Sequence, residues 1–195
     1  TAEAYGTESI VGCEINAFRD EMFVATKVST ENLGYRDVIE HAEASLQRLQ
    51  ISAIDLYQVH SPNPSIPIAE TMLAMEDLMA QGKVRFVGVS NFSVAQMKEA
   101  QESLKANPLV ANQVPYSLAS RDIEDDVLPY CQENGITVIA YTPIERGVFD
   151  SSDDTLRRIA ADLNASPAQV MLSWVVSHAG VIAIPKTDMV ERVDE

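Results

Sequence analysis

The stretch Ile54-Asp55-Leu56-Tyr57-Gln58-Val59-His60-Ser61-Pro62 decides how the rest of the chain is interpreted. Its β-branched and aromatic residues are typical of a short buried strand, and the change to polar residues and proline indicates where that strand ends. Because side chains alternate along a strand, Leu56, Gln58 and His60 share one face. His60 therefore stands at the C-terminal end of a strand, where parallel α/β folds place their catalytic groups. The alternative is a histidine that only hydrogen-bonds a neighbouring carbonyl.

Strands and helices alternate along the whole sequence. Strands are predicted at 23–28, 54–59, 85–89, 110–114, 136–141 and 181–184, and helices at 7–15, 35–49, 68–79, 94–104, 123–134, 155–163, 167–178 and 188–195. This alternation specifies a parallel sheet, and so many short apolar strands favour a barrel over an open sheet. We predict an α/β fold, a (β/α)8 TIM barrel with six βα units visible, forming a single domain over residues 1–195.

A closed barrel of this kind uses roughly 250 residues. The 195 residues are therefore expected to lack two strands at the front of the barrel. Two strands left at open edges would favour self-association, because an unpaired strand edge is a template for another chain.

Composition restricts the class of protein. Hydrophobic residues make up 46% of the chain, enough for one substantial core. No stretch approaches the roughly 20 apolar residues that span a bilayer, and the first residues do not resemble a signal peptide, so we expect a cytoplasmic protein without a membrane partner. Cys13 and Cys131 lack CxxC spacing, so neither a disulfide framework nor a zinc site is predicted.

The chain is strongly acidic, with 29 Asp and Glu against 14 Lys and Arg and a net charge of −15. Such a surface repels phosphate, so nucleic acids and anionic membranes are not expected as partners. It also suits a salt-rich cytoplasm.

Polar residues gather at the predicted strand ends. If the face of His60 points into a barrel, then Lys27, Ser90, Gln113 and Thr142 take matching positions on other strands. Barrel interiors are filled mostly by Val, Ile and Leu, so these polar residues indicate a site. An ammonium on the inner face is costly unless it has a partner or a function, although Lys27 could also extend to solvent from its strand end.

Two further polar groups have both functional and structural interpretations. Ser90-Asn91 could bind a ligand or could cap the next helix, a role that Ser93 would serve equally well. Lys186-Thr187 and Arg192 stand at the entry of the last predicted helix, where two cations and a helix N-terminus would hold a phosphate. The alternative there is a capping threonine with exposed charges.

Several motifs then match one family in a fixed order. They are Thr1-Ala2-Glu3-Ala4-Tyr5-Gly6, the Lys27 strand, Asp55-Leu56-Tyr57 through His60, Gly88-Val89-Ser90-Asn91-Phe92, Asn112-Gln113, Ala140-Tyr141-Thr142-Pro143 and Ile184-Pro185-Lys186-Thr187. Over essentially its whole length the sequence resembles an aldo-keto reductase of the bacterial or archaeal type. The resemblance implies a (β/α)8 barrel that transfers hydride from NADPH to a small-molecule aldehyde or ketone, without a metal.

The resemblance also assigns three catalytic residues. Tyr5 matches the general acid that protonates the carbonyl oxygen, Lys27 the cation that makes this phenol a stronger acid, and His60 the residue that orients the carbonyl. The chemistry is coherent, because a phenol ordinarily titrates near pH 10 and needs a close ammonium to act as an acid near neutrality. Without the resemblance, Tyr5 would be interpreted as a surface tyrosine near a helix start.

The cofactor residues follow in the same way. Ser90, Asn91 and Gln113 match the residues that bind the carboxamide, and Tyr141 matches the ring stacked on the nicotinamide. The pyrophosphate contact is expected over 142–147, with Thr142, Pro143, Ile144 and Gly147, and the 2′-phosphate site at Lys186, Thr187 and Arg192. A 2′-phosphate site favours NADPH/NADP+ over NADH.

The sequence departs from the family pattern at a few positions. An aspartate expected five residues before Tyr5 would fall before Thr1, outside the sequence, and a late asparagine would fall after Glu195. Ser61 replaces a common tryptophan, which predicts a more open pocket, and Glu145 replaces a common glycine. The alternative functions are therefore a nucleotide-binding regulatory module without turnover, or a folding fragment with no activity of its own.

Overall fold

The structure of the protein, a computed structural model, describes residues 1–145 and 154–193. It contains two compact units, Thr1–Ala111 and Asn112–Glu195. In both units helices alternate with strands that pair in parallel, so the predicted α/β class is confirmed. The single domain over residues 1–195 stays a prediction.

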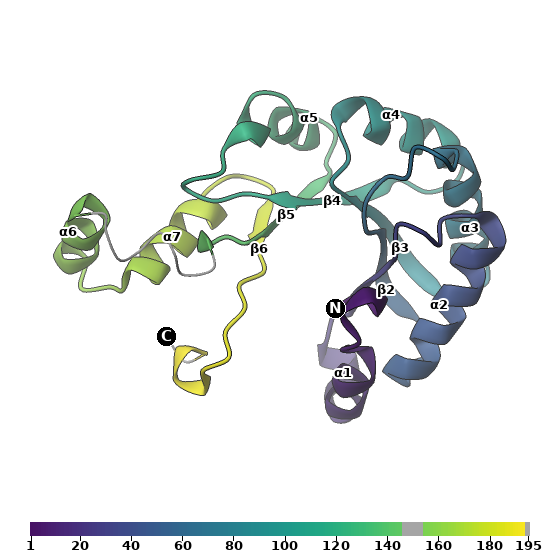
Figure 1. The fold of residues 1–195 in the computed structure, drawn as a ribbon, viewed down its shortest axis with the longest axis horizontal. Helices are drawn as coiled ribbons and strands as arrows, with labels where there is room; N and C mark the ends of the chain where they lie inside the picture. Colours follow the sequence, from purple (N-terminus) through teal and green to yellow (C-terminus); the bar gives the residue numbers. More distant parts are fainter. Residues whose placement is uncertain (146–153, 194–195) are drawn as a thin grey trace. The chain divides into compact units, whose positions relative to one another are not determined.

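The first unit holds three parallel strands in the order β1-β2-β3 and the helices that follow them. Figure 1 shows helices α2, α3 and α4 on one face of these strands. The elements, with η for a 3-10 turn, are η1 (Glu3–Tyr5), α1 (Glu8–Ile15), η2 (Asn16–Glu21), β1 (Ala25–Val28), α2 (Tyr35–Leu49), β2 (Ile54–Val59), α3 (Ile68–Ala80), β3 (Val84–Ser90), α4 (Val94–Ser103) and the start of β4 (Leu109–Pro115).

The register of the strands places the inward-facing residues of β1, β2 and β3 next to one another. Lys27 pairs with Gln58, and Gln58 pairs with Gly88, as the alternation of side chains predicts. A Cβ added to Gly88 would lie 3.1 Å from the Cγ of Gln58 and 3.2 Å from the carbonyl oxygen of Ala111. Glycine at this position therefore leaves room for the buried Gln58 side chain beside it.

The second unit continues the same alternation. Its elements are the end of β4, η3 (Asp122–Glu124), α5 (Val127–Glu133), β5 (Thr137–Tyr141), α6 (Asp154–Asp162), α7 (Pro167–Val176), β6 (Val181–Ala183) and η5 (Val190–Arg192). Strands β5 and β6 pair in parallel. Ser166 caps α7, because its hydroxyl accepts from the backbone N–H of Gln169 at 3.2 Å, which confirms the predicted start signal.

An aromatic cluster packs α7 against the loop after β4. The ring of Trp174 lies 5.3 Å from that of Tyr116 and 4.7 Å from that of His178, measured between centroids. The guanidinium of Arg121 lies 5.4 Å from the centre of the Trp174 ring. Tyr116 is completely buried, and its hydroxyl donates to Glu124 at 2.9 Å.

Two predicted helices differ from the structure. The helix predicted over 123–134 is split into η3 and α5, because Pro129 has no N–H and its ring clashes with the carbonyl four residues earlier. The helix predicted over 188–195 is only the turn η5 in the described residues. Met189 is extended there, with its backbone N–H bonded to the Thr187 hydroxyl at 3.1 Å.

Across residues 1–145 and 154–193, no helix combines the length and the apolar character that crossing a membrane requires.

Candidate active site

Tyr5 and His60 meet at the C-terminal end of β2. Tyr5 ends the short turn η1, and Gly6 follows with a positive φ of 64°, which terminates that turn. The Tyr5 hydroxyl lies 3.1 Å from Nε2 of His60, and the two rings meet edge to face with an interplanar angle of 87°. Tyr5 is 58% exposed, so a ligand can approach this pair from solvent.

Lys27 lies on β1 and is only 4% exposed. Its ammonium donates to the carbonyl oxygen of Thr1 at 3.3 Å. Burial lowers the pKa of Lys27 to about 8. Burial and then the positive charge of Lys27 lower the pKa of His60, which keeps this imidazole neutral at pH 7. Of the three predicted catalytic residues, Tyr5 thus contacts His60, and the charge of Lys27 acts on His60; their roles stay predictions.

A second tyrosine, Tyr57 on β2, differs from Tyr5 in burial and in pKa. Tyr57 is completely buried, and burial together with the Glu3 and Glu8 carboxylates raises its pKa well above the ordinary value. Tyr57 therefore keeps its proton and is out of reach of a ligand, unlike the exposed Tyr5.

Asn91 joins the ends of β2 and β3. Its side-chain amide lies 3.1 Å from the carbonyl oxygen of His60, from the hydroxyl of Ser61 and from the hydroxyl of Ser90. Asn91 has a φ of 61°, in the left-handed region that asparagine tolerates better than most residues. The N-cap of α4 is Ser93, whose hydroxyl accepts from the N–H of Gln96 at 3.3 Å. Capping therefore does not explain Ser90-Asn91.

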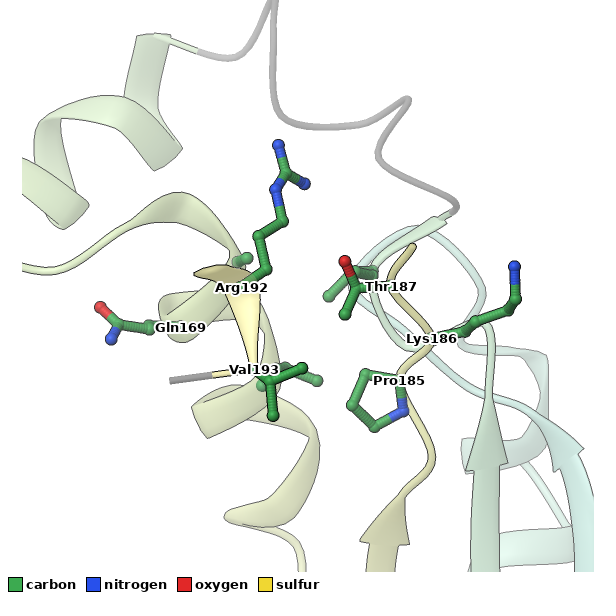
Figure 2. Close-up of a pocket in the computed structure, with 9 residues that line it drawn as sticks. Gln169, Pro185, Lys186, Thr187, Arg192 and Val193 are labelled. Atoms are coloured by element: carbon green, nitrogen blue, oxygen red, sulfur yellow. The ribbon is translucent and has the colours of Figure 1, made fainter. Parts of the chain in front are cut away.

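The second unit contains a pocket of about 340 Å³ beside η5 and the segment after β6 (Figure 2). It is lined by Ile144, Ala168, Gln169, Leu172, Pro185, Lys186, Thr187, Arg192 and Val193. A neighbouring pocket of about 420 Å³ shares Ile144 and Lys186 and adds Thr142, Pro143, Ile184 and Asp188. The predicted pyrophosphate and 2′-phosphate residues of the described chain therefore line adjoining cavities.

The two cations of this pocket do not converge on one point. The Lys186 ammonium donates to Asp188 at 2.6 Å, and Figure 2 shows the Lys186 and Arg192 side chains extending in different directions. Apolar walls with two exposed cations at the rim suit an anionic nucleotide, because the cations can turn toward a phosphate when one is present.

The remaining predicted cofactor residues are placed as follows. Gln113 is buried on β4, and Tyr141 is half-buried at the end of β5. Gly147 lies outside the described residues. Glu145 has a φ of 46°, and its carboxylate accepts a hydrogen bond from the hydroxyl of the buried Ser117. Within residues 1–145 and 154–193, no three His, Cys, Asp or Glu side chains are grouped to hold a metal ion.

Comparison with known proteins shows the family. A model of the aldo/keto reductase family matches residues 1–195, and the chain belongs to this family. Methylglyoxal reductase YeaE of Escherichia coli (strain K12) is 41% identical over 204 residues, which cover 100% of this chain and 71% of the relative. Glyoxal reductase of Bacillus subtilis (strain 168) is 36% identical over 200 residues, which cover 100% of this chain and 70% of the relative.

Solved structures similar to this chain belong to the same family. The crystal structure of a thermostable aldo-keto reductase in complex with the inhibitor epalrestat has a TM-score of 0.95 and 39% identity, covering 100% of this chain and 73% of that one. An aldo/keto reductase from Klebsiella pneumoniae in complex with NADP and acetate has a TM-score of 0.92 and 37% identity. The match covers 99% of this chain and 70% of that one. These relatives are (β/α)8 barrels, so the predicted fold class is confirmed.

Proposed function

We propose that the chain is an NADPH-dependent reductase that converts aldehydes or ketones to alcohols, with Tyr5 as the general acid. The observation that carries this proposal is the 3.1 Å contact between the Tyr5 hydroxyl and Nε2 of His60, next to the buried Lys27, in a member of the aldo/keto reductase family. This contact places the Tyr5 hydroxyl and the His60 ring together, so that a carbonyl oxygen bound between them could take hydrogen bonds from both.

Each side chain has a distinct task in the proposed reaction. When bound, the nicotinamide would supply the hydride that reduces the carbonyl carbon. Tyr5 transfers its phenolic proton to the carbonyl oxygen, which His60 orients by a hydrogen bond, and the alcohol leaves. Lys27 stabilises the phenolate that remains, and Tyr5 regains a proton from solvent because it is more than half exposed.

The proposed cofactor is NADPH. In the first unit, Ser90 and Asn91 are the residues predicted to contact the nicotinamide. In the second unit, Gln113 and Tyr141 are predicted to do the same, and the pocket at Lys186, Thr187 and Arg192 would take the adenosine end. The Klebsiella relatives crystallised with NADP or NADPH support this choice. The rim cations favour a ligand with an additional phosphate, and therefore NADPH over NADH.

The substrate class follows from the two named relatives, which are reductases of methylglyoxal and of glyoxal. We extend this to the chain: its substrates are small aldehydes that carry a second carbonyl group. Ser61 follows His60 in the chain and carries a hydroxyl, which makes this side of the site polar.

The test measures cofactor binding and turnover in one cuvette. NADPH binding is followed by the nucleotide's own emission, and oxidation at 340 nm is followed with methylglyoxal and with an aromatic aldehyde. Tyr5→Phe is expected to lower kcat at least about 100-fold while the Kd for NADPH changes less than about twofold. Tyr130→Phe, which removes a phenol from α5, is the control and keeps wild-type kcat.

Two outcomes would contradict the proposal. Wild-type turnover by Tyr5→Phe would exclude this residue as the acid. Tight NADPH binding without turnover of either aldehyde would favour the nucleotide-binding regulatory module instead.

A further inference from the structure

Two buried carboxylates flank the exposed tyrosine in the sequence. Glu3 precedes Tyr5 by two residues and Glu8 follows it by three. The Glu8 side chain is fully buried and that of Glu3 is 9% exposed, whereas Tyr5 itself points toward solvent. Carboxylates therefore lie on both sides of the Tyr5 turn, in addition to the contact of the phenol with His60.

Glu3 has a full set of partners. One carboxylate oxygen accepts from the backbone N–H of Ser29 at 2.7 Å and from the amide of Asn32 at 3.2 Å. The other lies 2.6 Å from Nδ1 of His41, a residue of helix α2. These hydrogen bonds outweigh the effect of burial and lower the pKa of Glu3, so the carboxylate is charged at neutral pH.

Glu8 is held in the same manner from the same helix. Its carboxylate accepts from the Thr26 hydroxyl on β1 and, at 2.7 Å, from both Nε and a terminal nitrogen of Arg48. That terminal nitrogen also lies 3.8 Å from Glu3. His41 and Arg48 are seven residues apart, two helical turns, so they project from one face of α2 toward both carboxylates.

The backbone of α1 also rests directly on α2 (Figure 1). A Cβ added to Gly12 would lie 2.6 Å from the carbonyl oxygen of Arg48 and 2.6 Å from that of Leu49. Glycine is needed at this close approach, and the contact fixes the segment on the C-terminal side of Tyr5.

We infer that His41 and Arg48 are positioning residues for the proposed reaction: through Glu3 and Glu8 they hold the Tyr5 hydroxyl against Nε2 of His60. Both residues lie on a helix outside the sheet, and no contact between either of them and Tyr5 is needed. The inference rests on the proposed role of Tyr5 as general acid. Loss of either anchor lets the turn shift, and misplacement of a reacting group by about 1 Å can cost about 100-fold in rate.

The kinetic test uses variants of α2. His41→Ala and Arg48→Met are expected to lower kcat by about tenfold or more, with the Kd for NADPH unchanged within twofold. His41→Asn keeps a nitrogen donor at the δ position and is expected to restore kcat to within about threefold of wild type. Arg36→Met removes an exposed arginine from the same helix and should leave kcat unchanged.

A second readout does not depend on turnover. With 3-fluorotyrosine incorporated, the ¹⁹F resonance of residue 5, assigned by its loss in Tyr5→Phe, reports the surroundings of the ring. We expect this resonance to shift or broaden in His41→Ala, to recover in His41→Asn and to stay in place in Arg36→Met.

The outcomes separate this inference from the proposed function. An unchanged ¹⁹F resonance and unchanged kcat in folded His41→Ala would overturn the positioning role. If the chain turns over no aldehyde, or if Tyr5→Phe stays active, the proposed function fails, and the ¹⁹F result alone decides whether α2 positions Tyr5. If Arg48→Met does not fold, the His41 pair of variants decides the matter.

Discussion

Lys27 carries a cost in stability for its proposed role in catalysis. Its pKa of about 8 in the folded chain lies below the ordinary value of 10.5, because burial disfavours the ammonium. Between pH 8 and 10.5 the unfolded chain binds the extra proton, so stability rises with pH across this window. Below pH 8 the full cost of burying the charge is present, on the order of 3 kcal/mol at 1.36 kcal/mol per pH unit.

Replacing this residue should therefore stabilise the protein and inactivate it. We expect Lys27→Met to raise the free energy of unfolding by about 1–3 kcal/mol at pH 7, with the gain lost above pH 10.5. Urea denaturation at pH 7 and above pH 10.5 measures the change in the free energy of unfolding. The control is Lys105→Met, which replaces an exposed lysine. An equal gain at both pH values would show that the ammonium is not the cause.

Wild-type turnover has its own pH dependence. Since the ammonium of Lys27 is the form that stabilises a phenolate, kcat/KM for aldehyde reduction should fall as pH rises above about 8. A rate profile from pH 6 to 10 tests this expectation. A profile that stays flat through pH 9 would contradict a role for the Lys27 charge.

At the scale of elements, the Asp55 carboxylate links the start of β2 to three neighbouring segments by ion pairs and a hydrogen bond. Its carboxylate lies 2.8 Å from Arg19 of η2 and 2.8 Å from Arg85 of β3, and accepts from the N–H of Val24 at 2.9 Å. Burial alone would raise the pKa of Asp55, but the N–H of Val24 and the two guanidinium groups lower it. The ionised form is therefore the one that holds these elements together.

Asp55→Asn is expected to lower the free energy of unfolding by about 3 kcal/mol at pH 7, because it leaves two guanidinium groups without their shared anion. For an acid with a lowered pKa, the stabilisation is present above the unfolded value near 3.9 and is lost as pH falls further. The difference from wild type should thus shrink at pH 3.5. Chemical denaturation at both pH values tests this, with Glu40→Gln on α2 as the matched exposed control.

Most helices and strands could be predicted because the sequence pattern that specifies each of them lies within its own residues. The bounds of α2 and β2 match the prediction, since an amphipathic period and a buried apolar run each define their own ends. The split at α5 was predictable from Pro129 but was not predicted. The shortness of η5 depends on the hydrogen bond between Thr187 and the backbone of Met189, which periodicity does not contain.

The site was harder to predict than the fold. His60 and Lys27 could be found from strand alternation, but Tyr5 was found only through the family motif, because a 3-10 turn has no periodic signal. Glu3 and His41 are 38 residues apart, and no spacing rule connects them. The hydrogen bonds of Asn91 to its neighbours were likewise missed, although the pairing of β2 with β3 places these strand ends together.

At the scale of the whole molecule, the net charge of −15 opposes folding by self-repulsion. Added salt screens this repulsion, with a Debye length of about 3 Å at 1 M. We expect 1 M KCl to raise the free energy of unfolding on the order of 1 kcal/mol, or about 2–4 °C in Tm. Thermal denaturation at 0.05 M and 1 M KCl measures this, and a lower Tm at the higher concentration would contradict it.

The aromatic cluster at α7 has a practical consequence. Trp174 is the single tryptophan of the chain and lies in the second unit, against Tyr116, His178 and Arg121. Its intrinsic emission therefore observes that unit alone, while circular dichroism averages over the helices of both. If the emission changes at a lower urea concentration than the ellipticity does, the second unit melts first and the protein passes through a half-folded intermediate. Coincident curves would mean that residues 1–111 and 112–195 unfold as one cooperative body.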